Sequence, residues 1–242
     1  MKSKYTKSTA VMLSQIDAYG RLSAAETFDL VMNTAAEAAE RMGMGIGFLG
    51  ERGLIWITVK TRIRFVNPPA LLDAIQVDSW PERPGEWRCE RYYRIRRGTE
   101  VMAMGKTEWA IVDTRTMRPQ RMEGLLPEDM EYTGEKVCPE PFPMIDEDFE
   151  EPPFAEHRVE ATDIDMARHM NNVAYVRAIV NAFSTEQWHR MGVRQMDVVF
   201  RSSAHEGDLL RFQKRRTGDC LDIRGILPDG VTCVLARLTV GK

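Results

Sequence analysis

The sequence predicts an α+β protein built from two copies of one unit, in which a central helix is wrapped by a long antiparallel sheet. One helix-like segment is followed by several strand-like segments, whereas a doubly wound parallel sheet would alternate helices with strands. An acidic, proline-rich segment, which we interpret as a surface linker, then interrupts the pattern at 123–156. After it, the same order of elements returns, which indicates an internal duplication.

The first repeat, residues 1–122, begins with an expected strand at 9–16 and continues with an expected helix from Arg21 to Gly43. Apolar residues recur along this segment at helical spacing, and its many alanines favour close packing on a sheet. Ser23 and Glu26 have the spacing of a capping box at the helix start. Gly43 is the residue type at which helices commonly end.

Long strands are expected after this helix. Apolar and polar side chains alternate along residues 54–66, which predicts a strand with one buried face. The polar face is expected to carry Thr58, Lys60, Arg62 and Arg64. Another strand is expected at 74–80, and strands at 86–95 and 100–113 flank a turn as an antiparallel hairpin.

The second repeat, residues 157–242, follows the same plan, with a strand, a single helix expected over 171–192, and further strands. Both expected helices end in Arg-Met-Gly. Residues after each helix also correspond, since Phe65 and Asp73 have the same separation as Phe200 and Asp208. Together these features predict a tandem (double) hotdog, with two central helices each wrapped by a long antiparallel sheet.

Composition narrows the class of protein. The chain has 242 residues and a net charge of −3, so nothing in its charge suggests a nucleic-acid partner. The N-terminus does not have the pattern of a secretory signal, and no apolar run is long enough to span a membrane. The four cysteines show no C-x-x-C spacing, so neither a zinc site nor a disulfide framework is predicted. A reduced, cytoplasmic protein is expected.

The densest polar cluster is Thr162–Tyr175, TDIDMARHMNNVAY, which leads into the second expected helix. Asn171 or Asn172 could simply cap that helix, and Asp163 or Asp165 could favour its positive end. The same place also suits acyl transfer, because free N–H groups at a helix start stabilise an oxyanion. A carboxylate beside them can attack a carbonyl or take a proton from water, and an imidazole can orient water or act as acid or base.

The first repeat provides an internal comparison for this cluster. It keeps Ile-Asp at 16–17 but continues with AYGRLS, where the second repeat has MARHMNN. A purely structural cluster could use the same residues at both helix starts. We therefore expect one working site per chain, built in the second repeat.

The segment TDIDMARHMNNVAYV resembles the active-site segment of acyl-acyl-carrier-protein (acyl-ACP) thioesterases, the plant and bacterial fatty-acyl chain terminators, which reads D-x-D-x-N-x-H-x-N-N-x-x-Y. The segments GLIWITVKTRIRF and NPPALLDAIQVDSWP also resemble that family. The resemblance implies hydrolysis of the thioester between a fatty acid and the carrier's phosphopantetheine arm, with no metal and no bound cofactor. It places Asp165 and His169 at the catalytic positions, and Asn171, Asn172 and Tyr175 at substrate-binding positions.

Two positions depart from the family pattern. Ala167 stands where the family has an asparagine, and Ser203 aligns with a glutamate that assists from the next strand, with Glu206 close by. Three functions stay open: hydrolysis of acyl-ACP, hydrolysis of coenzyme A thioesters, and acyl binding without catalysis. The departures favour the last function, whereas the retained Asp165 and His169 argue against it. Dehydratase chemistry fits the asparagine pair and the tandem order less well.

The N-terminal repeat is expected to hold the acyl chain between its helix and sheet. Residues that could line this tunnel, or form ordinary core, are Met32, Met42, Met44, Ile46, Phe48 and Trp56. A basic face is expected to dock the acidic carrier protein. Two clusters could supply it or be solvated strand faces: Arg91, Arg94, Arg96 and Arg97, and Arg211, Lys214, Arg215 and Arg216. A monomer and a homodimer are both open.

Overall fold

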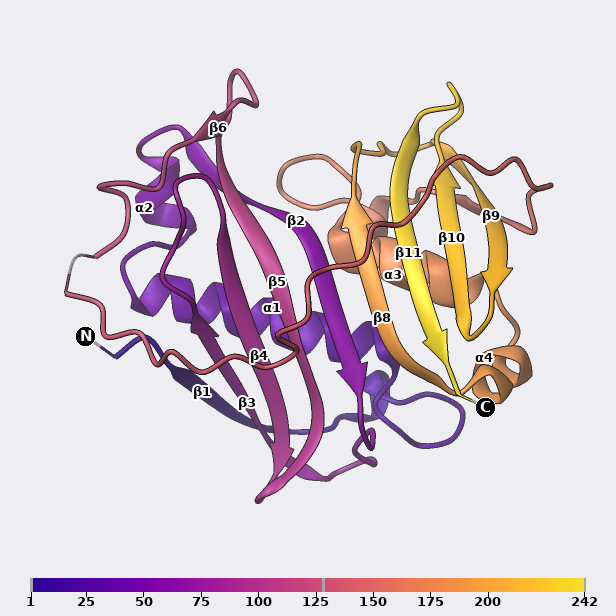
Figure 1. Cartoon of the computed structure of the whole chain (residues 1–242), viewed down its shortest axis with the longest axis horizontal. Coiled ribbons are helices and arrows are strands. Elements are labelled where there is room, and N and C mark those ends of the chain that lie inside the picture. The colour runs from indigo at the N-terminus through magenta and orange to yellow at the C-terminus, as the bar shows by residue number, and fades with distance from the viewer. Residues whose placement is uncertain (1, 128, 242) are drawn as a thin grey trace. The chain divides into compact units, whose positions relative to one another are not determined.

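The computed structural model describes residues 2–127 and 129–241 (Figure 1). The chain divides into two compact units, Met1–Glu140 and Pro141–Lys242. Each unit contains an antiparallel sheet and a principal helix, as the duplicated pattern predicts. The predicted α+β architecture is therefore confirmed.

The N-terminal unit has five main strands in the spatial order β1-β3-β4-β5-β2, and the short β6 pairs with β5. Its elements are β1 (Tyr5–Ala10), η1 (Leu13–Gln15), α1 (Ala24–Arg41), α2 (Ile46–Gly50), β2 (Leu54–Phe65), β3 (Ala74–Pro81), β4 (Cys89–Arg97), β5 (Glu100–Asp113) and β6 (Pro119–Gln120). The strand expected at 9–16 was misplaced. Residues 13–15 form a 3-10 turn because the Gln15 side chain accepts a hydrogen bond from the Met12 N–H at 2.9 Å.

Helix α1 forms as its sequence predicts. The Ser23 hydroxyl accepts the Glu26 N–H at 3.2 Å, and Gly43 follows the helix with a φ of 68°. Phe28 and Ala35 are among its buried residues. Figure 1 shows α1 across one face of this sheet, whereas the segment after β6 runs over the other face.

The expected polar face of β2 was partly wrong. Thr58 and Arg62 are buried, because a bulge between Thr58 and Lys60 shifts the alternation and the chain after β6 covers the outer face of the sheet. The Arg62 guanidinium donates to the carbonyl oxygen of Glu140 at 3.0 Å. Sequence alternation alone cannot anticipate this cover.

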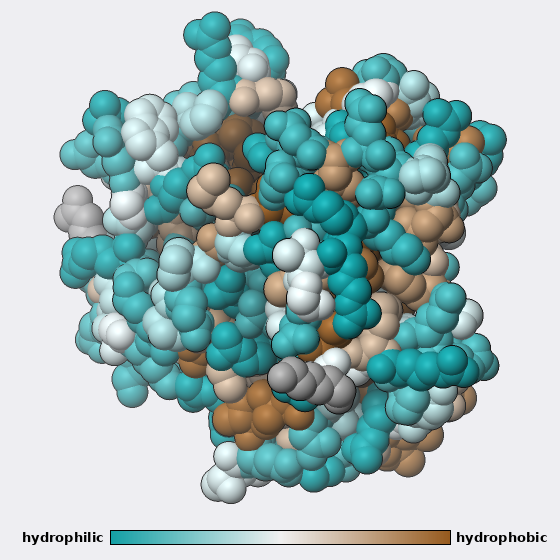
Figure 2. Space-filling view, turned by 45° about the vertical axis from the view of Figure 1, so that its right-hand side comes forward, coloured by the Kyte–Doolittle hydropathy of each residue, from teal (hydrophilic) through white to brown (hydrophobic). Residues whose placement is uncertain are grey.

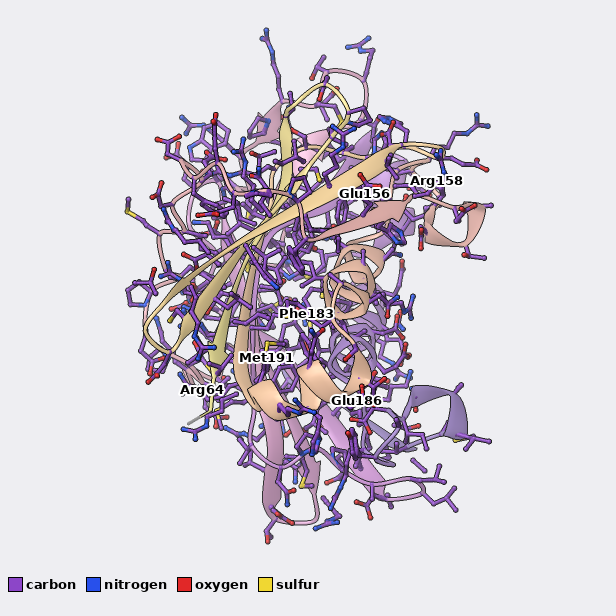
Figure 3. The ribbon with its side chains drawn as sticks, turned by 90° about the vertical axis from the view of Figure 1, so that its right-hand side faces the viewer. Arg64, Glu156, Arg158, Phe183, Glu186 and Met191 are labelled. Atoms are coloured by element: carbon purple, nitrogen blue, oxygen red, sulfur yellow. The ribbon has the colours of Figure 1, made fainter. Side chains whose placement is uncertain are left out.

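The C-terminal unit has the strand order β8-β11-β10-β9-β7. Its elements are β7 (Ala155–Arg158), η2 (Ala161–Asp163), α3 (Asn172–Asn181), α4 (Thr185–Met191), β8 (Val193–Phe200), β9 (Leu209–Thr217), β10 (Cys220–Ile226) and β11 (Thr232–Val240). Glu156 and Arg158 lie on β7, at one edge of this sheet (Figure 3).

The single helix expected over 171–192 was wrong, because α3 ends at Asn181 and a new helix, α4, begins at Thr185. Ser184 caps α4 by accepting the Gln187 N–H at 3.2 Å, and the Gln187 side chain accepts the Ser184 N–H at 2.9 Å. Phe183 lies at this junction, and Glu186 and Met191 lie on α4 (Figure 3). The capping box therefore interrupts a continuous apolar pattern.

We expect Ser184→Ala to lower the free energy of unfolding by about 1 kcal/mol, because the substitution leaves N–H groups at the start of α4 without their acceptor. Urea unfolding monitored by circular dichroism measures the change. Thr185→Ala is the matched control, since that residue is exposed and supplies no cap. Equal effects of the two substitutions would contradict the assigned cap.

Hydrophilic residues make up most of the face shown in Figure 2, and hydrophobic residues show between them in small groups. Single exposed apolar side chains such as Leu13 and Met144 are normal on a folded protein. Among the described residues, no helix is both long enough and apolar enough to cross a membrane.

Candidate active site

The polar segment 162–175 forms a tight turn that leads into α3. Ile164 and Met170 make an antiparallel bridge, and inside it the Asp165 N–H donates to the His169 carbonyl at 2.9 Å. The Asp165 carboxylate accepts the N–H of Ala167 at 2.8 Å, and Arg168 has a left-handed φ of 61°. Asp165 and His169 are therefore held at the two ends of one turn.

The N-terminal unit contains the same turn. Ile16 and Leu22 make the bridge, and the Asp17 N–H donates to the Arg21 carbonyl at 2.7 Å. The Asp17 carboxylate accepts the Tyr19 N–H at 2.9 Å, and Gly20 has a φ of 72°. An aspartate thus closes the turn in both repeats, so this role of Asp165 belongs to the duplicated scaffold.

The duplication extends to the loop that lies beside each turn. The Met170 N–H donates to the Ala204 carbonyl at 2.8 Å, as the Leu22 N–H does to the Pro69 carbonyl at 2.8 Å. The Asp208 carboxylate accepts the His205 N–H at 2.8 Å, and in the first repeat the Asp73 carboxylate accepts the Ala70 N–H at 2.9 Å. His205 therefore occupies the position of Ala70.

A pair of imidazoles distinguishes the C-terminal turn from its N-terminal counterpart. His169 stands where the first repeat has Arg21, and its ring lies edge-to-face on the ring of His205, with centroids 5.0 Å apart and planes at 87°. The Nδ1 atom of His205 is 4.0 Å from an oxygen of Asp208. At this distance the two side chains make no hydrogen bond, but Asp208 accepts the His205 N–H and so holds the loop that carries the exposed imidazole beside His169.

His205 was missed by reasoning from the sequence. The signal was available, because His205 is one of four histidines and Asp208 follows it by three residues, at the position already matched to Asp73. Glu206, which was considered instead, is exposed, and so is Ser203. Among the described residues, neither side chain makes a hydrogen bond to Asp165 or His169.

The two asparagines have different surroundings. The Asn171 side chain caps α3 by accepting the Val173 N–H at 2.8 Å, and its own N–H donates to the Asp163 carbonyl at 2.7 Å. Asn172, the first residue of α3, is half-buried, and its amide makes no hydrogen bond to another described residue. Asn172 is therefore the asparagine whose amide is available to a ligand.

Tyr175 is buried, and its hydroxyl joins α3 to the loop that carries His205. It accepts the Ala204 N–H at 2.8 Å and donates to the Ser202 carbonyl at 3.3 Å. Burial raises the pKa of Tyr175, so the phenol stays protonated and keeps its donor. The other acid of the segment, Asp163, contacts the His157 imidazole at 2.9 Å instead of facing the helix start.

The predicted basic clusters are engaged within their own units. Arg91 is buried and does not lie on a solvated strand face. The rest of its cluster forms ion pairs: Arg94 with Glu135, Arg96 with Asp78, and Arg97 with Asp73 and Glu100. In the second cluster Arg211 pairs with Glu156, Arg215 with Asp146, and Lys214 lies over the ring of Phe154. Within the described parts of the chain, no group of three or more His, Cys, Asp or Glu is arranged to hold a metal ion.

Family models match both parts of the chain. The model of the acyl-ACP thioesterase N-terminal domain matches residues 2–128, and the model of the C-terminal domain of the same family matches residues 146–223. The chloroplastic oleoyl-acyl carrier protein thioesterase of Coriandrum sativum is 21% identical over 212 residues, which are 76% of this chain and 56% of that protein. The chain thus spans about half the length of the curated relatives it matches.

Solved structures agree with the predicted fold. An acyl-ACP thioesterase from Bacteroides thetaiotaomicron superposes with a TM-score of 0.88 at 18% identity, covering 99% of this chain and 98% of that one. The 12:0-ACP thioesterase from Umbellularia californica gives a TM-score of 0.79 at 14% identity, covering 97% and 96%. These likenesses confirm the tandem hotdog fold. With both of its domain models matched along most of the sequence, the chain belongs to the acyl-ACP thioesterase family.

Proposed function

We propose that this protein hydrolyses fatty acyl-ACP thioesters to free fatty acid and carrier protein, which ends fatty-acid synthesis. One observation carries the proposal beyond family membership. The turn that precedes α3 contains Asp165 and His169, and His205 lies against His169, whereas the same turn in the first repeat has neither histidine. A duplicated scaffold with one set of imidazoles fits one reactive site per chain.

In the proposed mechanism, the thioester carbonyl lies at the start of α3. The first N–H groups of a helix and its partial positive charge stabilise the oxyanion that forms on the carbonyl oxygen. Asp165 either attacks the carbonyl carbon directly or takes a proton from an attacking water. His169 orients the water and protonates the departing sulfur as the carbon–sulfur bond breaks and the thiol leaves. If water attacks, the acid is released in that same step; if Asp165 attacks, the mixed anhydride formed on Asp165 is then hydrolysed by water, which releases the acid and restores the carboxylate. No metal or bound cofactor enters any step.

The remaining residues of the segment have supporting parts in this proposal. Asn172 contacts the substrate through its amide, Asn171 fixes the start of α3, and Tyr175 holds the loop of His205 against α3. His205 positions His169. It also supplies a polar side chain near the turn, where Ala167 lacks the amide of the family's asparagine.

The N-terminal unit binds the acyl chain in this proposal. Met42 and Met44 are core residues that pack with Ala38 and Met130, and Trp56 is partly buried against them. Ile46, in contrast, is 50% exposed. We therefore interpret both methionines as ordinary core residues and not as residues that line the acyl tunnel.

We expect His205→Ala to lower kcat about tenfold or more while KM changes little, because His169 loses the neighbour that fixes its orientation. The pH dependence of kcat should change as well, which a purely structural role would not produce. Steady-state hydrolysis measured across the pH range tests this. His189→Ala, on α4, is the control and should leave the profile unchanged. An unchanged profile in His205→Ala would remove His205 from the site.

Fatty-acid release from acyl-ACPs and from coenzyme A thioesters of matched chain length tests the function. Release that depends on the carrier supports the proposal, whereas equal or faster release from coenzyme A thioesters supports the second enzymatic function. Tight acyl binding without release from any substrate would indicate a non-catalytic binder. That third outcome has a specific observation in its favour, since Ala167 offers only its backbone N–H to Asp165.

The binding partner, the oligomeric state and the cellular location are part of the same proposal. Acyl carrier protein is the macromolecular partner, and the oligomeric state is a monomer or a homodimer. The curated relatives are named chloroplastic, so the cytoplasmic location predicted for this chain stays a proposal.

A further inference from the structure

Arg91 lies in the interior of the N-terminal unit, and the residue is only 6% exposed. The Nη1 atom donates to the Ser79 hydroxyl at 3.0 Å, and no carboxylate of the described residues pairs with the guanidinium. Burial, the largest influence, lowers the pKa of Arg91, but a guanidinium stays charged in proteins. Among the residues that the structure describes, Arg91 is therefore a buried cation whose only polar side-chain partner is a neutral hydroxyl.

The position of Arg91 in the sheet shows which face it occupies. Cys89, two residues earlier on β4, packs with Leu49 of α2 and with Ile111. Tyr92 lies on the opposite face, where it packs with Val137 of the covering segment. Arg91 therefore points to the helix side of the sheet, where a hotdog unit has its apolar interior.

Other hydrogen-bonding groups surround Arg91 on this face. Thr107 lies directly opposite it on β5, and the Thr107 hydroxyl is 3.0 Å from that of Thr61. The Trp109 indole N–H reaches the Tyr93 hydroxyl at 3.4 Å. Thr61, Thr107 and Tyr93 are completely buried. A guanidinium and several hydroxyls thus lie on the inner face of the sheet, where apolar core side chains would otherwise be expected.

Other buried ions of the protein show how Arg91 differs. Lys106 pairs with Glu90 at 2.9 Å on the opposite face of the same sheet. Asp222 forms a two-point ion pair with Arg237 in the C-terminal unit, at 2.6 and 2.8 Å. Removing a charge from water is costly unless an opposite charge compensates it. Arg91 lacks that compensation in the protein alone, so an anionic ligand would supply it.

We propose that Arg91 binds the carboxylate of an aliphatic ligand that occupies the N-terminal unit. The planar guanidinium fork matches a carboxylate in geometry, and the Ser79 hydroxyl, which accepts from Arg91, keeps its own proton to donate. The inference that the ligand is aliphatic depends on the proposed function, whereas the inference that it carries a carboxylate depends on the buried guanidinium of Arg91. That carboxylate is either the head group of the released fatty acid or a second acid group at the far end of an acyl chain.

Calorimetric binding to the full chain tests the proposal, with dodecanoic acid, methyl dodecanoate and dodecanol as probes. The wild type is expected to bind the acid about 10- to 100-fold more tightly than the ester or the alcohol. Arg91→Met should abolish this preference, and Arg211→Met, which removes an exposed arginine, should keep it. Equal binding of acid and ester by the wild type, or a preference that survives in Arg91→Met, would overturn the proposal.

The stability of the variants separates a binding role from a structural one. Arg91→Met should raise the Tm of the ligand-free protein, because an apolar side chain of similar length replaces an uncompensated buried cation. Arg91→Lys and Ser79→Ala are the second test, and each should weaken the preference for the acid at least threefold in a folded protein. A fall in Tm for Arg91→Met, together with full preference in these two variants, would make Arg91 structural.

Turnover then distinguishes the two sources of the carboxylate. If Arg91 receives a distal acid group, Arg91→Met slows hydrolysis of the dodecanedioic thioester and spares the dodecanoic one. If it receives the head group of the product, Arg91→Met relieves inhibition by dodecanoate and spares both thioesters. Asp165→Asn should bind dodecanoate normally. If the wild type binds the acid selectively but hydrolyses no thioester, the proposed hydrolytic function is wrong and the proposed role of Arg91 still holds.

Discussion

Asp165→Asn is expected to lower the rate of thioester hydrolysis by about a thousandfold or more, with little change in stability. The asparagine side-chain oxygen can still accept the Ala167 N–H, so the turn is retained. It has no negative charge, so it can neither attack the carbonyl nor take a proton from water, and losses of this size are typical when such a group is removed. Single-turnover hydrolysis of an acyl-ACP, with circular dichroism as the check on folding, measures both quantities.

Asp17→Asn is the matched control for this prediction, because Asp17 closes the equivalent turn by accepting the corresponding N–H of Tyr19, in addition to the Arg21 N–H at 3.0 Å. Any cost of placing an amide in this turn appears in both variants, whereas a loss of chemistry appears only in Asp165→Asn. We expect Asp17→Asn to hydrolyse the substrate at the wild-type rate. Near-normal turnover by Asp165→Asn would withdraw the assignment of Asp165.

Asp78→Asn is expected to lower the free energy of unfolding by about 3–5 kcal/mol, the range for breaking a buried ion pair from one side. Asp78 is 1% exposed, and the Arg96 guanidinium donates to both of its oxygens, at 2.9 and 3.2 Å. The Thr6 hydroxyl donates to it at 2.7 Å. The carboxylate thereby joins β1, β3 and β4, and chemical denaturation at neutral pH measures its contribution.

The pH dependence of this contribution follows from the pKa of Asp78. Burial, the largest single influence, raises that pKa, but the hydrogen bonds from Arg96 and Thr6 and the nearby cations outweigh it, so the net shift is downward. The unfolded-state pKa is about 3.9. The contribution is therefore complete above that pH and is lost as the pH falls through the lower folded-state pKa. The stability difference between wild type and Asp78→Asn should be constant from pH 7 to about 5 and should shrink on further acidification.

Glu100→Gln is the control for Asp78→Asn, because Glu100 pairs with Arg97 at the exposed turn of the β4–β5 hairpin. Its removal should change stability little, since exposed ion pairs contribute little. An equally small effect of Asp78→Asn would show that the buried pair contributes nothing beyond surface charge.

The parts of the fold that sequence predicts well are those set by local chemistry. Ser23 caps α1 and Gly43 ends it because both act on neighbouring N–H and C=O groups. The break at Ser184 was also signalled locally, by Ser184 and Gln187, but the apolar spacing on both sides favoured a single helix. The burial of Arg62 could not be predicted in the same way, because the chain that covers it comes from residues near Glu140.

The same distinction applies to the site. Asp165 and His169 lie in one short turn, so a linear motif contains both of them. His205 reaches the ring of His169 from another segment, and only the folded unit places the two together. Arg91 shows a different error, because it was grouped with the other arginines of a charge-rich strand as a docking or solvated face, whereas it is buried.

The repeated turn gives this protein an internal reference for every substitution in its reactive loop. Two pairs of positions have nearly identical backbone surroundings: Asp17 with Asp165, and Ala70 with His205. Substitutions at paired positions can therefore be compared in one molecule under one set of conditions. The difference between paired substitutions isolates catalysis from folding without a second protein for comparison. The repeated turn also suggests a gain-of-function design. Arg21→His combined with Ala70→His would place two imidazoles on a turn that already has its aspartate. This double variant would test whether the imidazole pair is sufficient to give the first repeat a reactive site of its own.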